Sequence, residues 1–173
     1  HLGGIDWDQC LAELINDRFK DEHGIDLRKD STASEGLIDE SIRIKHTLTA
    51  RDEATVRFGH DGKRLQFEVA RSEFEQRTGG LLDRTRMTVK RLLKDAKIVW
   101  PDVTRLLLVG GSTRMPMVQT MLERESGLQV DRSLSPDEAV AHGAAIYAGM
   151  LLAGGKGVKQ SFAIRNVSSH DLG

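Results

Sequence analysis

The first part of the chain shows two helical patterns. Apolar residues recur every three or four positions over residues 5–23, and Gly24 follows where a helix commonly ends. The second pattern starts near Thr32 and Glu35, which have capping-box spacing, and runs to about Leu48. We therefore expect two consecutive helices.

The next stretch alternates between apolar and polar positions. Alternation covers residues 54–60 and 65–69, and Asp61 and Gly62 stand between the two runs. Alternation is typical of half-buried strands, and an Asp-Gly pair favours a tight turn. The pattern predicts a two-stranded antiparallel hairpin.

A long helical pattern follows, from a capping-box pair at Ser72 and Glu75 to about residue 96. Gly79 and Gly80 interrupt it, and each glycine inside a helix costs about 1 kcal/mol relative to alanine. We therefore expect two helices end to end, with a break that also marks a subdomain boundary.

A continuous apolar run at residues 106–109 leads into Gly110 and Gly111 and predicts a strand buried on both faces. Pro116 suits the first position of a helix that ends at Gly127. The glycines allow a close approach to a ligand, and a helix N-terminus favours an anion. The pattern predicts a nucleotide or phosphate cradle, with an ordinary strand-to-helix turn as the equal alternative.

The last predicted elements follow this helix. Residues 128–130 suit a short strand, and Ser135 and Pro136 have the N-cap and N1 positions of another helix. That helix spans about residues 139–153 and is rich in small residues, so we expect it to pack closely against sheet or ligand. Residues 154–157 have the composition of a flexible linker.

Candidate chemistry gathers on the second predicted helix. Ile42, Lys45, His46 and Thr49 stand at i, i+3, i+4 and i+7, which places them on one face. A stripe of apolar, cationic, aromatic and hydroxyl groups is able to recognise a base and a sugar. A partly solvated surface is the favoured alternative on this pattern alone.

Two features near the start of the chain have a structural interpretation and a functional alternative. Gly3 and Gly4 precede the first helix, where a plain turn is favoured over a second backbone approach to a ligand. Cys10 lies within that helix, and packing is favoured over a nucleophilic role because no basic partner is evident.

The composition is that of a soluble globular protein, with 173 residues, 39% hydrophobic residues and a net charge of −1. The lack of a basic excess argues against a nucleic-acid partner. No apolar run approaches the ~18 residues of a membrane span. The single cysteine excludes an internal disulfide and favours a reducing compartment. Because the chain begins at His1 in what looks like the middle of a fold, we expect a fragment.

Three motifs together carry a family resemblance. Residues 1–8, HLGGIDWD, resemble the HLGGEDFD segment of the 70-kDa heat-shock (DnaK-type) chaperones. Residues 107–116, LLVGGSTRMP, resemble their VLVGGSTRIP, and residues 135–145, SPDEAVAHGAA, resemble their NPDEAVAYGAA. The motifs occur in the same order at matching intervals and cover nearly all of residues 1–155.

The resemblance implies an α/β chain of the actin-like ATPase (ribonuclease H-like) fold, namely a fragment of its second lobe. Residues 1–83 then correspond to an outer α+β subdomain, helices plus a small antiparallel sheet. Residues 84–154 correspond to an incomplete inner α/β subdomain, and residues 155–173 to a linker or tail toward a following domain.

The resemblance also implies an ATP or ADP site. Arg114 then lies against adenine, which is physically reasonable because guanidinium groups stack on flat π-systems. Lys45 and Thr49 match positions that bond ribose and adenine, Asp137 lies beside the pocket, and His46 replaces a second stacking arginine. The implied nucleotide-binding set is Lys45, His46, Thr49, Gly110, Gly111, Ser112, Arg114 and Asp137, with no catalytic or metal-binding residue.

Several positions depart from the family pattern. Ile42 replaces the ribose-binding glutamate and cannot accept a hydrogen bond, and His46 is mostly uncharged near neutral pH. We expect weakened or altered nucleotide binding. Arg165 and Asn166 stand where the interdomain linker usually has apolar and acidic residues, which argues against the usual docking of a substrate-binding domain.

In function, the resemblance implies the nucleotide-binding half-domain of a cytoplasmic chaperone of the stress response. The complete parent then uses Mg with ATP or ADP. Its implied partners are a nucleotide-exchange factor, J-domain-type co-chaperones, and unfolded clients bound through a separate domain. The family's phosphate loops and catalytic lysine and glutamate precede the position of His1, so we expect no ATP hydrolysis by this chain alone.

Two other functions stay open. One is a nucleotide-independent, chaperone-like interaction module, for which Ile42 and His46 are the evidence. The other, less favoured, is a lobe of a sugar or acetate kinase with the same fold. The strand at residues 106–109 lacks its usual neighbours, so we also expect self-association or a partly disordered inner subdomain.

Overall fold

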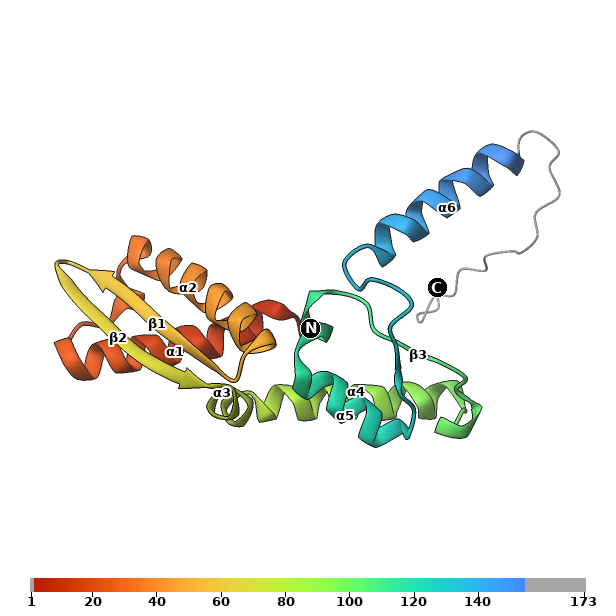
Figure 1. Cartoon of the computed structure of the whole chain (residues 1–173), viewed down its shortest axis with the longest axis horizontal. Helices are drawn as coiled ribbons and strands as arrows, with labels where there is room; N and C mark the ends of the chain where they lie inside the picture. The colour runs from red at the N-terminus through yellow and green to blue at the C-terminus, as the bar shows by residue number, and fades with distance from the viewer. Residues whose placement is uncertain (1, 155–173) are drawn as a thin grey trace, which may run out of the picture. The chain divides into compact units, whose positions relative to one another are not determined.

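The computed structural model describes residues 2–154 (Figure 1). They belong to two compact units that divide in sequence between Pro136 and Asp137. The first unit holds most of the elements. The predicted linker and tail, with Arg165 and Asn166, lie outside the described residues.

Two long helices open the first unit, as predicted. Helix α1 spans Gly4–His23 and ends at Gly24, whose φ of 73° suits glycine. A short 3-10 helix, η1, spans Leu27–Lys29. Helix α2 spans Ser31–Ala50, and the Asp30 side chain accepts a hydrogen bond from its first turn.

The predicted capping box at the start of α2 is wrong. The Asp30 carboxylate accepts a hydrogen bond from the Ala33 backbone N–H at 2.8 Å, so Asp30 is the N-cap residue. Thr32 and Glu35 therefore lie inside the helix. A carboxylate is a good acceptor for the free N–H groups of a first turn, and it fixes the start of α2 at Ser31.

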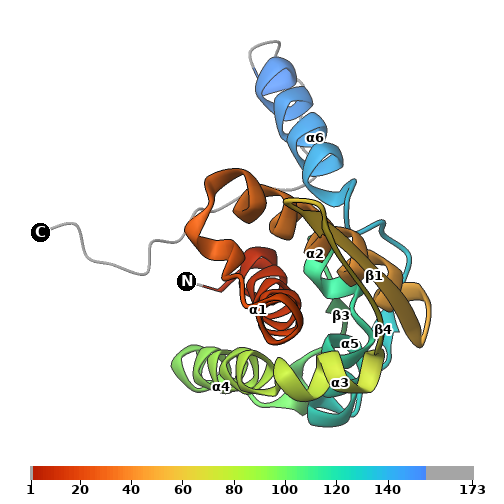
Figure 2. The same cartoon turned by 90° about the vertical axis from the view of Figure 1, so that its left-hand side faces the viewer.

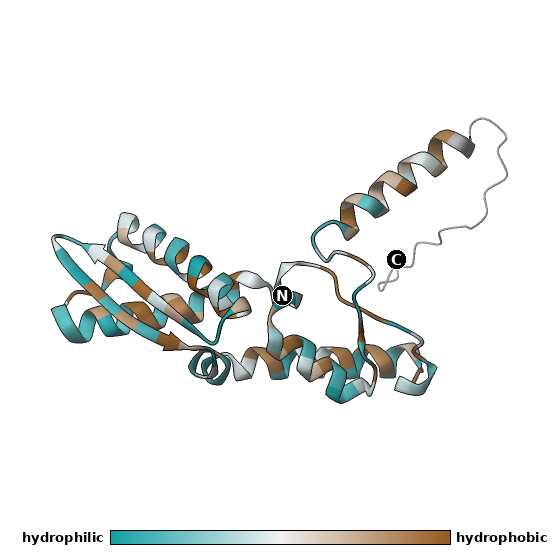
Figure 3. Cartoon of the chain, viewed as in Figure 1, coloured by the Kyte–Doolittle hydropathy of each residue, from teal (hydrophilic) through white to brown (hydrophobic). Residues whose placement is uncertain are grey.

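The predicted hairpin is confirmed. Strand β1 spans Glu53–His60, β2 spans Lys63–Ala70, and the two pair antiparallel along their whole length. Asp61 and Gly62 form the turn, both with positive φ, which matches the twist of the flanking strands. Hydrophobic and hydrophilic residues alternate along both strands (Figure 3).

The core of the first unit forms where α1, α2 and the hairpin meet. The two helices lie side by side and both contact the strands (Figure 2). Burial of each large apolar side chain stabilises the fold by about 1.5–3 kcal/mol. The fully buried apolar side chains of this core are Leu11, Leu14, Ile15, Phe19, Leu27, Leu37, Ile44, Leu48, Val56 and Val69.

The predicted break at the glycine pair is confirmed. Helix α3 spans Arg71–Arg77 and α4 spans Gly79–Ala96, with the buried Thr78 between them. Thr78 is the C-cap residue of α3, and its hydroxyl donates to the Phe74 carbonyl at 2.8 Å. The predicted capping box at Ser72 and Glu75 is wrong. Helix α3 begins at Arg71, and its N-cap residue is Ala70, which offers no side-chain cap.

The glycine-loop region has less sheet than predicted. A 3-10 helix, η2, spans Trp100–Asp102, and strand β3 covers only Leu106–Leu107. Within the described residues, β3 pairs with one neighbour, the parallel strand β4 at Val130–Asp131. The expected burial of residues 106–109 on both faces is wrong, because Leu107 and Val109 are 48% and 46% exposed.

The helix after the glycine loop begins and ends as predicted. Helix α5 spans Pro116–Ser126, with proline in its first turn. Gly127 follows it with a φ of 71°. The strand expected at residues 128–130 is shifted, since β4 begins only at Val130.

The described part of the second unit is one helix, α6, at Ala139–Gly154. The predicted span of about residues 139–153 is confirmed, but the predicted N-cap at Ser135 and N1 at Pro136 are wrong. Pro136 lies in a turn, and a helical bond runs from the His142 N–H to the Glu138 carbonyl. The apolar residues of α6 surround the axis, and its packing against sheet or ligand stays a prediction. None of the described helices is long and apolar enough to cross a bilayer.

Candidate functional site

The glycine loop turns through a short 3-10 helix, η3, at Gly111–Arg114. Gly110 has a φ of 92°, which favours glycine, and its N–H donates to the Pro136 carbonyl at 3.0 Å. The Gly110 carbonyl accepts from both the N–H and the hydroxyl of Thr113, at 3.1 and 2.7 Å. Because η3 separates the glycines from α5, the glycines do not lead directly into that helix, and the predicted nucleotide or phosphate cradle stays a prediction.

Lys45 reaches from α2 to the start of α1. Its Nζ lies 2.7 Å from Oδ1 and 2.8 Å from Oδ2 of Asp8, and 3.3 Å from the carbonyl oxygen of Gly4. The side chains of Lys45 and Asp8 are only 13% and 7% exposed. A buried carboxylate is costly unless it is paired, so Lys45 compensates the charge of Asp8.

Gly4 brings Ser112 to the same place. A Cβ on Gly4 would lie 3.1 Å from Ser112 Oγ and 3.4 Å from Lys45 Nζ. A larger residue at position 4 would therefore require the Ser112 side chain to shift by a few tenths of an ångström. The close neighbour of Gly4 is protein, so the alternative of a backbone approach to a ligand at Gly3 and Gly4 stays a prediction.

A cleft of about 410 Å³ lies next to η3 and joins two further predicted residues, Thr49 and Arg114. Thr49 comes from the last turn of α2 and Arg114 from the end of η3. The Thr49 hydroxyl donates to the Lys45 carbonyl at 2.9 Å, which leaves its oxygen lone pairs facing other donors. The cleft is lined by Thr49, Leu108, Arg114, Gln119, Val130, Asp131, Arg132, Leu134, Ser135 and Pro136.

Three polar lining residues were not predicted from the sequence. The Gln119 side chain donates to the Thr113 carbonyl at 3.1 Å and accepts from Arg132 at 3.3 Å, so this wall of the cleft is ordered. Hydrogen bonds from Ser133 hold the pKa of Asp131 below its usual range, and its carboxylate stays ionised at neutral pH. These residues lie outside the recognised motifs and share no spacing that would have indicated a site.

The remaining predicted residues are not brought into this cleft. His46 is exposed on α2, and neither it nor Ile42 is among the lining residues. Gly110 and Gly111 shape the loop without lining the cleft. Asp137 belongs to the second unit, in the turn before α6, so its place in a site stays a prediction.

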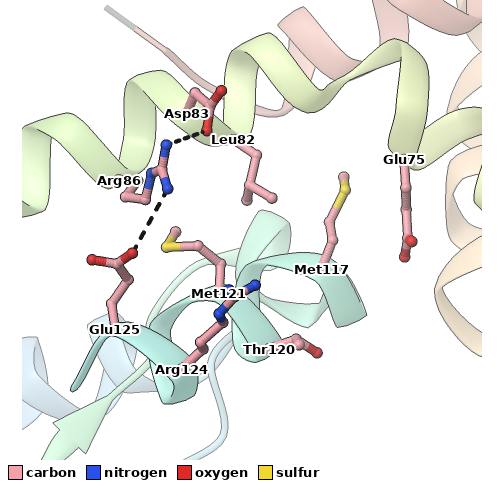
Figure 4. A pocket seen from close by; sticks show the side chains of 9 residues that line it. All are labelled: Glu75, Leu82, Asp83, Arg86, Met117, Thr120, Met121, Arg124 and Glu125. Carbon is pink, nitrogen blue, oxygen red and sulfur yellow. Dashed lines mark ion pairs between the residues drawn. The ribbon is translucent and has the colours of Figure 1, made fainter. Parts of the chain in front are cut away.

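A second hollow, of about 370 Å³, runs between α4 and α5 (Figure 4). Arg86 lies between Asp83 and Glu125, at 2.9 and 3.8 Å, and Lys90 lies 2.7 Å from Glu125. The hydrogen bond from Lys90 keeps the pKa of Glu125 below its ordinary value. This hollow contains none of the predicted site residues. Its ion pairs connect α4 with α5.

The sequence matches known proteins along its whole length. The model of the family described as Hsp70 protein matches residues 1–173. The chaperone protein DnaK of Mesomycoplasma hyopneumoniae strain 7448 is 41% identical over 157 residues, covering 87% of this chain and 26% of the relative. DnaK of Thermotoga maritima is 41% identical over 166 residues, which cover 92% of this chain and 28% of the relative. DnaK of Prochlorococcus marinus strain MIT 9515 is 38% identical over 157 residues, which cover 87% of this chain and 25% of the relative. The chain thus spans about a quarter of the length of these relatives.

Proposed function

Because this chain belongs to the Hsp70 protein family, we propose that it supplies the adenosine side of an ATP or ADP site in a heat-shock-type molecular chaperone. Its α/β architecture then forms part of the second lobe of an actin-like ATPase domain. Residues 1–83 are the outer subdomain, residues 84–154 the inner one, and residues 155–173 lead to a following domain.

The observation that carries this proposal is the cleft beside η3. Thr49 and Arg114 both line this cleft, although they are 65 residues apart in the sequence. The resemblance assigns both residues to the nucleotide. The cleft volume of about 410 Å³ falls within the range of about 300–1,000 Å³ typical of small-molecule sites. A nucleoside therefore fits the size and the polar lining of the cleft.

Each residue has a distinct role in this proposal. The Arg114 guanidinium stacks on the adenine face, where a planar cation gains both dispersion and electrostatic attraction. The Thr49 hydroxyl accepts a hydrogen bond from the base or sugar. Lys45 and Ser112 meet at Gly4 and supply donors to the ribose or to the first phosphate.

The proposal assigns no residue of this chain to the transfer of a phosphoryl group. That reaction requires phosphates held by Mg²⁺ and an oriented water molecule. We therefore propose that the chain alone does not turn over ATP. Steady phosphate release that persists through repeated repurification would contradict this.

Calorimetry with ADP tests the binding proposal. We expect Arg114→Ala to weaken ADP binding about tenfold or more, since loss of a desolvated cation–π contact costs about 2 kcal/mol. Arg91→Ala is the matched control, because Arg91 is 84% exposed on α4 and lies outside the cleft. No heat from the unmodified chain at high ADP concentration would overturn the proposal.

The same titration tests the second candidate, a nucleotide-independent interaction module. The observations that favour this candidate are that Ile42 and His46 stay outside the cleft and that Ile42 is 37% exposed. An exposed apolar residue on a helix face suits a protein contact. Absence of ADP binding, together with retained folding, would favour this module over the nucleotide site.

For the parent protein, we propose the partners and setting of a DnaK-type chaperone. These are a nucleotide-exchange factor, J-domain-type co-chaperones and unfolded clients, in the cytoplasm and during stress. Co-purification of the parent with a J-domain protein in an ATP-dependent manner tests this. Equal recovery with and without ATP would contradict it.

A further inference from the structure

We infer that Asp8 is a positioning residue for Lys45, which it holds where an oxygen of the nucleotide accepts a hydrogen bond. The inference rests on the proposed function for its ligand, and on the geometry of α1 and α2 for its mechanism. Asp8 ends the HLGGIDWD motif, but no contact with the nucleotide was assigned to it.

The Lys45 ammonium is bound to α1 through two hydrogen bonds. It donates to Oδ2 of Asp8 at 2.8 Å and to the Gly4 carbonyl at 3.3 Å. Oδ1 of Asp8 lies 2.7 Å from Nζ and completes the ion pair without a hydrogen bond of its own. Gly4 and Asp8 are one helical turn apart, so a single ammonium group contacts both.

The two kinds of acceptor are not equivalent. The contacts to Asp8 are short, charge-assisted and almost closed to solvent, whereas the Gly4 contact is long and to a neutral carbonyl. The Gly4 carbonyl also accepts within α1, since it stands at the start of that helix. A ligand oxygen thus competes with the Gly4 carbonyl rather than with Asp8, which keeps Lys45 in place.

The surroundings indicate which ligand oxygen takes this position. Ser112 Oγ and Lys45 Nζ lie 3.1 and 3.4 Å from the point that a Cβ on Gly4 would occupy. A hydroxyl donor and an ammonium donor that meet at one point suit a hydroxyl or anionic oxygen, as in a ribose or a phosphate. A base edge does not require a charged donor there.

A positioning role makes a specific prediction for binding. Asp8→Asn keeps the size of the side chain but frees Lys45 from its charged anchor. We expect Asp8→Asn and Lys45→Met each to weaken ADP binding about tenfold, the scale of one charge-assisted hydrogen bond. The double variant should be no weaker than Lys45→Met alone, because Asp8 acts through Lys45.

The controls separate positioning from simple loss of structure. Asp21→Asn removes an exposed carboxylate from the same helix and should leave ADP binding unchanged. A double variant about tenfold weaker than Lys45→Met would mean that Asp8 acts independently, which would overturn the inference. Melting curves of all variants show whether each one folds.

Acylation of lysines, read by mass spectrometry, tests the anchor without nucleotide. In the unmodified chain Lys45 should react several-fold more slowly than the exposed Lys20 of α1, because its ammonium is buried and bonded. Asp8→Asn should speed the reaction at Lys45 and leave Lys20 unchanged, and an unchanged rate at Lys45 would overturn the inference. If the unmodified chain does not bind ADP, the proposed function fails while the acylation rates still decide the role of Asp8.

Discussion

Ser112 Oγ lies 3.1 Å from the point that a Cβ on Gly4 would occupy. The contact joins the first turn of α1 to the η3 loop, more than a hundred residues later in the sequence. Gly4 has no positive φ, so the close approach of Ser112, and not the backbone conformation, is what favours glycine here. The start of α1 and the glycine loop are thus one packed unit.

Replacement of Gly4 by alanine should reveal this contact. Alanine near the start of a helix normally stabilises by up to about 1 kcal/mol, but at Gly4 the Ser112 side chain has to move. We expect no gain for Gly4→Ala, against a gain of about 0.4–1 kcal/mol for the control Gly80→Ala, whose Cβ meets nothing within 4 Å. Urea unfolding measures both, and equal gains would show that Ser112 does not restrict the position.

Replacement of Ile42 by glutamate should improve nucleotide binding. Ile42 stands one turn before Lys45 on α2 and is 37% exposed, so a carboxylate there faces solvent or a ribose. Under the proposed function, this carboxylate accepts hydrogen bonds from the ribose hydroxyls, which the Ile42 side chain cannot do. We expect ADP to bind several-fold more tightly, about 1 kcal/mol, with little change for 2′,3′-dideoxy-ADP.

The control for this gain is Thr47→Glu, which adds the same charge to a different face of α2. It should leave the affinity for ADP unchanged, since its side chain lies away from Lys45 and Thr49 along the helix face. Equal gains for both variants would indicate a general charge effect. Equal gains for ADP and its dideoxy analogue would contradict a contact with ribose.

Asn16 should be intolerant of an apolar replacement of similar size. It is fully buried in α1, and its Oδ1 accepts a hydrogen bond from the Leu27 N–H at 2.8 Å. Asn16→Leu leaves that N–H without its partner, which should lower the free energy of unfolding by about 1–3 kcal/mol. Gln9→Leu on the exposed side of α1 is the control, and equal stability of the two variants would disprove the role of this bond.

Cys10 should react slowly with alkylating agents. Burial raises the pKa of its thiol, and the carboxylates of Glu13 and Asp6 raise it further. The thiolate is the reactive form, so less of it exists at pH 8 than in an unfolded peptide. At pH 8 the folded chain should react with iodoacetamide more slowly than the denatured chain. As the pH is raised further, the rate of the folded chain should still increase at pH values where the rate of the denatured chain has become constant. Matching pH profiles would contradict the raised pKa.

Much of the secondary structure could be predicted because its signals are local. The 3.6-residue recurrence of apolar positions over residues 5–23 gave the span of α1, and the Asp61-Gly62 pair located the hairpin. The glycine pair at Gly79 and Gly80 located the break between α3 and α4. The caps were predicted poorly, because Thr32 and Asp30 are both good cap residues and only the folded backbone selects between them.

The candidate site was predictable only in part. The family resemblance indicated Thr49 and Arg114, which the structure brings to one cleft, and Lys45 and Ser112, which both lie close to Gly4. Gln119 and Arg132 could not be predicted, since their places in the cleft wall depend on how α5 and β4 pack. His46 shares a helix with Lys45 but lies outside the cleft, because a common face of a helix does not imply a common neighbour.

The sequence by itself determined the helical and strand periods, the turn glycines, the start of α5 at Pro116 and, through three motifs, the family. These depend on neighbours a few residues apart, or on residue order alone. The tertiary structure alone decided that Asp8 pairs with Lys45, which is 37 residues away, and that Ser112 packs against Gly4. A sequence pattern shows which face of a helix is buried, but the partner of a buried charge is chosen only when the helices pack.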